Sequence, residues 1–119
     1  MDDEFPSCVA ITTAVERRED AERIAEALLA GQLAACVQIA PVASRYRWRG
    51  AIERADEWLC TIKTRAALFE AIERAIRAVH PYEVPELIAT PVVRGGADYL
   101  AWIASETEST PSTATSSEP

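Results

Sequence analysis

The chain has 119 residues, of which 49% are hydrophobic and 26% are charged, so it fits a single globular domain of ordinary composition. Its formal net charge is −7, but six of the acidic residues lie in the two terminal segments, and the remaining body is nearly neutral. This balance argues against a general nucleic-acid binder. No apolar run reaches the roughly 18 residues that a membrane-spanning helix needs.

Hydrophobic patterning predicts a strand, a helix and a second strand in the first third of the chain. Residues 7–14 are short, apolar and β-branched, which is typical of a strand. Residues 16–32 carry apolar side chains at helical spacing, and Gly31 marks the end of that helix. The second strand is expected at residues 33–39, and Pro41 just beyond it indicates a sheet edge or a bulge.

The middle of the chain is predicted to form one long β-hairpin around Gly50. Apolar and polar residues alternate on both sides of this glycine, which gives arms at 34–49 and 51–64. Each arm would span roughly 45–50 Å at about 3.3 Å per residue, whereas a globule of this length is only about 35 Å across. A ribbon that overhangs its own domain and carries Tyr46 and Trp48 is an aggregation hazard unless another chain covers it. We therefore expect an obligate homo-oligomer.

The last third of the chain predicts a helix, a strand and a short final helix. The first of these helices is expected at residues 65–79, because the proline two positions later ends it. A strand follows at 87–93, where Pro91 again indicates an edge or a bulge, and Asp98 is expected to cap the final helix. The resulting order, β-α-β-β-α-β plus a terminal helix, predicts the α+β class and a ferredoxin-like sandwich with both main helices on one face of an antiparallel sheet.

Composition divides the chain into one domain and two flanking segments. Residues 1–6 are expected to form a flexible acidic arm, residues 7–104 the folded domain, and residues 105–119 a disordered Ser/Thr-rich tail. The three cysteines are an odd number without a C-x-x-C motif, which favours reduced thiols. The acidic first residues lack the pattern of a signal peptide, so we expect a cytoplasmic protein.

Five sequence blocks together resemble the signature of the CutA divalent-cation tolerance family. They occur in the order that the family has, and they span about residues 7–104. The blocks are LAACV (33–37), YRWRG (46–50), IKT (62–64), HPYEVPE (80–86) and DYLAWI (98–103). The resemblance implies a ferredoxin-like subunit in a tight trimer similar to the PII signalling proteins, a link to copper and other divalent metals, and no established catalytic activity.

The segment 80–86 is the strongest candidate for a metal site. Two prolines stiffen it and fix how His80, Glu83 and Glu86 project, and these side chains offer nitrogen and oxygen ligands. Cys36 is a further candidate, because a thiolate combined with an imidazole favours copper. The alternative for His80 is a structural role at the end of a helix, and the alternative for Cys36 is packing in a strand.

The chain departs from the family pattern at two positions. Some members carry a cysteine before the Thr-Ala pair of the first strand and a second histidine before His-Pro-Tyr. Thr12 and Val79 stand at those positions here. Of the three ligands implied by those members, His80 alone carries over, so the resemblance implies a weakened copper constellation.

A second candidate site is a ligand pocket around Lys63. This residue is the only lysine of the chain and follows an apolar strand, where its ammonium suits a small anionic ligand in a cleft between subunits. Tyr46, Trp48, Tyr82 and Trp102 are candidate walls of that cleft, and the alternative is that these aromatic residues anchor a subunit interface.

Other classes of function find less support in the sequence. No phosphate-binding loop, nucleophile elbow or zinc-protease motif occurs, and His80 is the only imidazole. The near-neutral body also argues against an RNA-recognition module of the same topology. We therefore expect a protein that is not an enzyme. Two hypotheses remain, a trimer that binds a metal or a small ligand and a trimeric scaffold that presents its surface to a protein partner.

Overall fold

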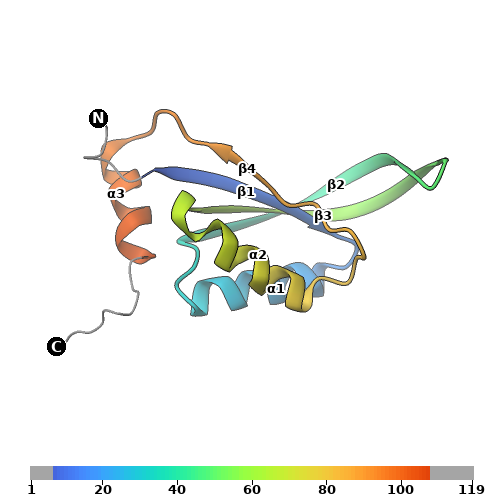
Figure 1. Ribbon diagram of the computed structural model, residues 1–119, viewed down its shortest axis with the longest axis horizontal. Helices are drawn as coiled ribbons and strands as arrows, with labels where there is room; N and C mark the ends of the chain where they lie inside the picture. The colour runs from blue at the N-terminus through green and yellow to red at the C-terminus, as the bar shows by residue number, and fades with distance from the viewer. Residues whose placement is uncertain (1–6, 108–119) are drawn as a thin grey trace.

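The computed structural model describes residues 7–107, which form a four-stranded sheet and three α-helices (Figure 1). The elements in chain order are β1 (Cys8–Val15), α1 (Arg18–Ala30), β2 (Cys36–Trp48), β3 (Ala51–Arg65), a 3-10 turn η2 (Ala66–Leu68), α2 (Phe69–Val79), β4 (Ile88–Pro91) and α3 (Ala97–Glu106). Every predicted strand and helix is present. The ends of the predicted elements differ from the observed ones by a few residues.

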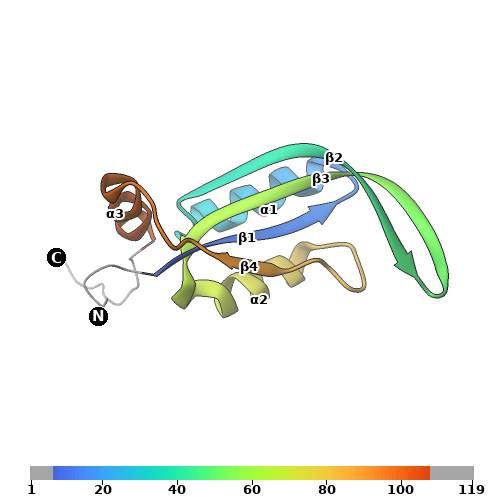
Figure 2. The ribbon, with the colours of Figure 1, turned by 90° about the horizontal axis from the view of Figure 1, so that it is seen from above.

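The sheet is antiparallel and has the strand order β2-β3-β1-β4. Figure 2 shows α1 and α2 side by side beneath it, while α3 lies at the end of the sheet away from the hairpin tip. Both main helices therefore cover the same face. This arrangement confirms the predicted α+β fold with a split β-α-β topology.

The hydrophobic core lies between that face and the two helices. Strands β1 and β3 supply Ile11, Cys60 and Ile62, which are fully buried, and α2 supplies Ile72 and Ile76. Burial of such side chains is worth about 1.5–3 kcal/mol each, so this layer supplies much of the stability of the domain.

The opposite face of the sheet, here called the open face, carries mostly small or polar side chains. Within residues 7–107, no helix covers it beyond the end where α3 lies (Figures 1 and 2). Cross-strand register sets its rows, because side chains on paired residues project to the same side. The open face comprises Ala10, Thr12, Ala14, Cys36, Gln38, Ala40, Leu59, Thr61 and Lys63.

The β2–β3 hairpin extends well beyond the rest of the sheet. Strand β1 pairs with β3 only as far as Trp58, so within residues 7–107 no strand outside the hairpin pairs with residues 42–57. We call this part the overhang. The molecule measures 52 × 28 × 21 Å, and Figure 1 shows the overhang at one end of the long axis. The predicted projection of the hairpin is thereby confirmed.

A two-residue turn closes the hairpin. Arg49 and Gly50 both have positive φ, at 52° and 85°, which matches the right-handed twist of the strands that they join. Glycine takes this conformation without steric cost, whereas a non-glycine residue is disfavoured by roughly 1–2 kcal/mol. Arg49 therefore holds a conformation that the pairing of Trp48 with Ala51 imposes on it.

Both predicted edge prolines lie on edge strands. Pro41 is in β2 and Pro91 is in β4, the two outermost strands of the sheet. A proline has no N–H, so it is tolerated where a strand has a partner on one side only.

Two predictions at the C-terminal end were wrong. Gly96, not Asp98, is the N-cap of α3, and Asp98 lies in the first turn, where its charge faces the helix dipole. The helix also runs to Glu106, and Thr107 beyond it is buried. Arg65 holds Thr107 by donating to its hydroxyl and its carbonyl, so the domain extends past the predicted boundary at residue 104. The rest of the predicted tail, and residues 1–6, lie outside the described residues.

Candidate functional site

A cavity of about 630 Å³ lies where the overhang and the segment 80–87 meet. We call it the hairpin cavity. Its volume is in the range of small-molecule sites in proteins and is far larger than a single metal ion requires. It is lined by Ala14, Ser44, Arg45, Tyr46, Trp48, Glu57, Tyr82, Glu83, Val84, Pro85 and Glu86.

Register explains why the hairpin residues gather there. Ser44, Tyr46 and Trp48 alternate along β2 on the side of the open face, and Glu57 has the same orientation on β3. Because no helix within residues 7–107 covers the open face at the overhang, the aromatic side chains remain partly exposed, and Trp48 keeps 38% of its surface accessible. The walls of the cavity are therefore aromatic without belonging to the core.

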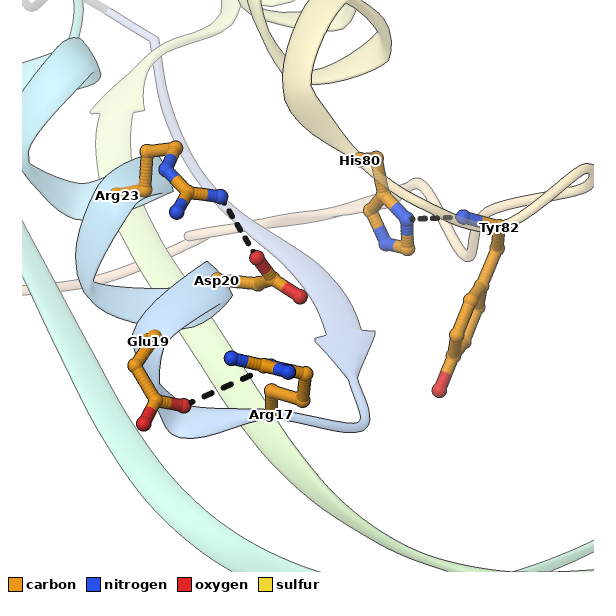
Figure 3. Close-up of polar contacts among 6 residues, drawn as sticks. All are labelled: Arg17, Glu19, Asp20, Arg23, His80 and Tyr82. Carbon is orange, nitrogen blue, oxygen red and sulfur yellow. Dashed lines mark hydrogen bonds and ion pairs between the residues drawn. The ribbon is translucent and has the colours of Figure 1, made fainter.

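His80 anchors the segment that forms the other wall. It is 9% exposed, its Nε2 lies 3.0 Å from the carbonyl oxygen of Ala14, and its Nδ1 lies 3.2 Å from the amide nitrogen of Tyr82. Figure 3 shows the bond to Tyr82. An amide can only donate, so Nδ1 accepts and Nε2–H donates, which requires the neutral ring. His80 thus ties the end of β1 to the segment after α2.

The surroundings of His80 keep the ring neutral. Burial lowers the pKa of His80 below its ordinary 6.5, and the Ala14 carbonyl and the carboxylates of Asp20 and Glu57 oppose this effect. Asp20 is itself held by Arg23 at 2.7 Å, as Figure 3 shows. The net direction is downward, so desolvation outweighs the attraction of the two carboxylates.

Glu57 and Tyr82 form the most buried polar pair of the cavity. Glu57 is 7% exposed, and the Tyr82 hydroxyl donates to its Oε2 at 2.7 Å. Burial raises the pKa of Tyr82, and the hydrogen bond to Glu57 raises it further. Within residues 7–107, no arginine or lysine forms an ion pair with Glu57. A buried carboxylate therefore lies beside the cavity with a hydroxyl as its partner.

The two remaining carboxylates of the lining have different partners. Glu83 pairs at 3.1 Å with Arg49 of the hairpin turn, and both side chains are well exposed. Glu86 accepts a hydrogen bond of 2.7 Å from the hydroxyl of Thr12. Arg49 also lies over the ring of Trp48, so the exposed pair joins the hairpin turn to the opposite wall.

The four predicted metal ligands do not form one cluster within a chain. Both ring nitrogens of His80 are engaged, and Cys36 pairs with Lys63 at the far end of the open face. Glu83 and Glu86 line the cavity but bind other partners. In the part of the chain that is described, no three His, Cys, Asp or Glu side chains are placed to hold a metal ion. The residues of one chain therefore do not fit a metal centre.

The predicted ligand pocket divides into two groups. Tyr46, Trp48 and Tyr82 come together in the hairpin cavity. Lys63 instead lies 5.8 Å from the ring centre of Tyr99 on α3, the helix that also carries Trp102. The predicted cleft lies between subunits, so the anionic ligand at Lys63 stays a prediction, and within one chain Lys63 does not face the first group.

Sequence reasoning missed Glu57 as a site residue. The alternation of β3 contained the signal, because Glu57 has the same parity as Leu59 and Thr61 and therefore projects from the open face. What could not be seen is that Tyr82, 25 residues later, reaches this position. That contact depends on the path of the segment 80–87 across the sheet.

The family profile described as "CutA1 divalent ion tolerance protein" matches residues 8–106. The chain belongs to the CutA1 divalent ion tolerance family. Protein CutA of Mus musculus is 47% identical over 90 residues, covering 75% of this chain and 51% of the relative. The divalent-cation tolerance protein CutA of Thermus thermophilus is 40% identical over 94 residues, covering 78% of this chain and 91% of the relative. The chain thus spans about half the length of the first mammalian CutA relatives.

Solved CutA structures share the fold along nearly their whole length. CutA1 from Oryza sativa superposes with a TM-score of 0.85 at 34% identity, covering 89% of this chain and 98% of that one. The protein from Archaeoglobus fulgidus, described as periplasmic, has a TM-score of 0.83 at 39% identity, covering 85% and 99%. Among residues 7–107 of this CutA chain, none of the helices combines the length and the apolar character needed to cross a membrane.

The buried neutral His80 predicts a specific dependence of stability on pH. A pKa that is lower in the folded state than in the unfolded state means that folding loses stability as pH falls below the unfolded value of about 6.5. Between about pH 7.5 and pH 5.5, the urea midpoint of the wild type should fall more than that of His80→Gln, which keeps an N–H donor for Ala14. Equal changes in the two proteins would show that His80 charges as freely in the folded state as in the unfolded state.

Proposed function

We propose that the protein is a homotrimer that binds a small molecule in the hairpin cavity, without catalytic turnover, in the manner of a PII-like sensor. The observation that carries the proposal is the cavity itself, which combines three aromatic walls with a buried carboxylate at the sheet face. A volume of about 630 Å³ and a small number of convergent polar groups are typical of ligand sites.

The overhang and the open face support assembly. Ile52 on the overhang is 69% exposed, and Ile88 on β4 is 59% exposed. The open face carries several small side chains, such as Ala10, Ala40 and Thr61, which let a second copy approach closely. An exposed strand ribbon of this length is stabilised when another copy covers it. Three copies are the number that the family resemblance implies.

Sedimentation equilibrium tests the assembly. We expect a single species with three times the mass of one chain across the micromolar range, because the exposed Ile52 of each overhang, on the side of the hairpin away from the cavity, needs a neighbour to cover it. A folded species with the mass of one chain at these concentrations would contradict the proposal. A stable dimer would retain assembly but would contradict the number of subunits.

Calorimetric titration with a panel of small molecules tests ligand binding. The panel contains compounds of similar size with cationic, neutral and anionic groups. We expect saturable binding of at least one class, and Trp48→Leu should weaken it about tenfold, which corresponds to the loss of one aromatic wall. Trp102→Leu is the matched control, because Trp102 is exposed to a similar degree, 41% against 38%, but lies on α3 away from the cavity.

The absence of saturable binding by every class would contradict the ligand-binding function. Equal losses in Trp48→Leu and Trp102→Leu would show that the binding site lies elsewhere.

Binding of a divalent metal, with copper as the expected ion, is the second candidate, and the description of the family favours it. A metal site would need donors from more than one chain, with Glu83 and Glu86 as oxygen donors. In that case His80 would have to give up its bond to Tyr82 or to Ala14. The geometry of one chain therefore supports the small-molecule function better.

Copper titration separates the two candidates. In titrations with micromolar copper, we expect His80→Gln to remove no saturable binding heat that the wild type shows, because both ring nitrogens of His80 are already engaged. Saturable binding in the wild type that disappears in His80→Gln, with the trimer intact, would establish the metal function instead.

The expected location in the cytoplasm stays a prediction. The three cysteines Cys8, Cys36 and Cys60 are all free, which suits a reducing compartment. Burial raises the pKa of the Cys60 thiol to about 11 and also raises the pKa of Cys8, so these two thiols are protonated at neutral pH.

A further inference from the structure

We infer that the ligand of the hairpin cavity is an organic cation, an ammonium compound with an alkyl body. This inference rests on the proposed ligand-binding function and specifies the chemistry of its ligand. Three features of the cavity lead to it, namely the balance of charge in the lining, the partners of Glu57 and the arrangement of the aromatic rings.

The lining carries an excess of negative charge. Three carboxylates, those of Glu57, Glu83 and Glu86, contribute to it, whereas Arg45 is the one cationic residue of the lining. Arg49 offsets Glu83 in an exposed pair, and such a pair is strongly screened by water. Glu57 and Glu86 accept hydrogen bonds from hydroxyl groups and have no cationic partner within residues 7–107. The lining therefore attracts a cation and repels an anion.

Glu57 is the side chain with the most to gain from a cationic ligand. An ionised carboxylate that is largely removed from water is costly unless a charge compensates it. The Tyr82 hydroxyl occupies one oxygen, Oε2, and no described residue donates to the other. A ligand ammonium next to that oxygen supplies the missing charge. Burial also makes this attraction stronger than it would be on the protein surface.

The aromatic rings of the cavity also favour a cationic ligand. Tyr46, Trp48 and Tyr82 line the cavity from two sides, because the first two lie on β2 and the third lies on the segment after α2. The faces of aromatic rings attract cations, and groups of such rings are a recurring way of binding alkylated ammonium groups. A bare metal ion has no apolar surface to fill this space, whereas an alkylammonium ion has both the charge and the apolar body.

A matched pair of ligands tests the assignment. Choline carries a trimethylammonium group, and 3,3-dimethyl-1-butanol has the same shape with a neutral carbon in place of the nitrogen. Calorimetry on the assembled wild-type protein should show choline binding at least about tenfold more tightly than its neutral isostere. Equal affinities, tighter binding of the isostere, or no binding of choline would each overturn the assignment.

Two neighbouring carboxylates of β3 provide the matched variants. Glu57→Gln removes the charge at the cavity and keeps an oxygen that accepts from Tyr82, and it should weaken choline about tenfold while leaving the isostere within about twofold. Asp56→Asn removes a charge one residue away, on the opposite side of the hairpin, and should change both affinities less than about twofold. Equal effects of the two substitutions would show that choline responds only to the general charge of the hairpin.

Titration with the panel of cationic, neutral and anionic compounds distinguishes the organic-cation proposal from the general ligand-binding proposal. Binding of a neutral or anionic compound that Trp48→Leu weakens, together with no preference for choline, would refute the organic cation and leave the ligand-binding function standing. No binding by any compound would refute both. If Glu57→Gln does not assemble, Trp48→Leu provides the second variant, because it should reduce the advantage of choline over the isostere.

Discussion

The pairing of β2 with β3 is the constraint on which the rest of the molecule depends. Because this ladder continues past the end of β1, residues 42–57 form a ribbon that the core does not support. The ribbon projects aromatic side chains over the open face, and it creates a cavity against the segment 80–87. The same extension leaves apolar surface exposed at the hairpin tip. The cavity and the exposed surface that a neighbour would cover thus both result from the extension of the β2–β3 ladder past β1.

Two hydrogen-bonded links hold the walls of the cavity in place. His80 joins the end of β1 to the segment after α2, and Tyr82, two residues further on, joins that segment to Glu57 on β3. Pro81 and Pro85 within this segment restrict its backbone, so few conformations have to be selected. The only imidazole of the chain therefore positions the wall of the site, which is the structural role at a helix end that stood beside the metal-ligand interpretation.

The sequence predicted the fold well because the relevant signals are local. Alternation on both sides of Gly50 predicted the hairpin and its overhang, and the prolines at 41 and 91 indicated edges or bulges, of which the edges are observed. The site was predicted only in part, because it depends on contacts between distant segments. Parity could have placed Glu57 on the open face, but its contact with Tyr82 follows from tertiary packing. The separation of Lys63 from Tyr46, Trp48 and Tyr82 does so as well. The cap of α3 was missed because Gly96 takes the extended backbone that Asp98 was expected to adopt.

The prolines in the two outermost strands bear on how such molecules can join. Each one removes a backbone donor from a border of the sheet, so a strand that adds there forfeits a hydrogen bond. Growth by endless lateral stacking of sheets into a fibre is thereby disfavoured. Contacts through the sheet faces and the protruding ribbon can instead close into a ring of fixed size, in which each copy covers one neighbour and is covered by another.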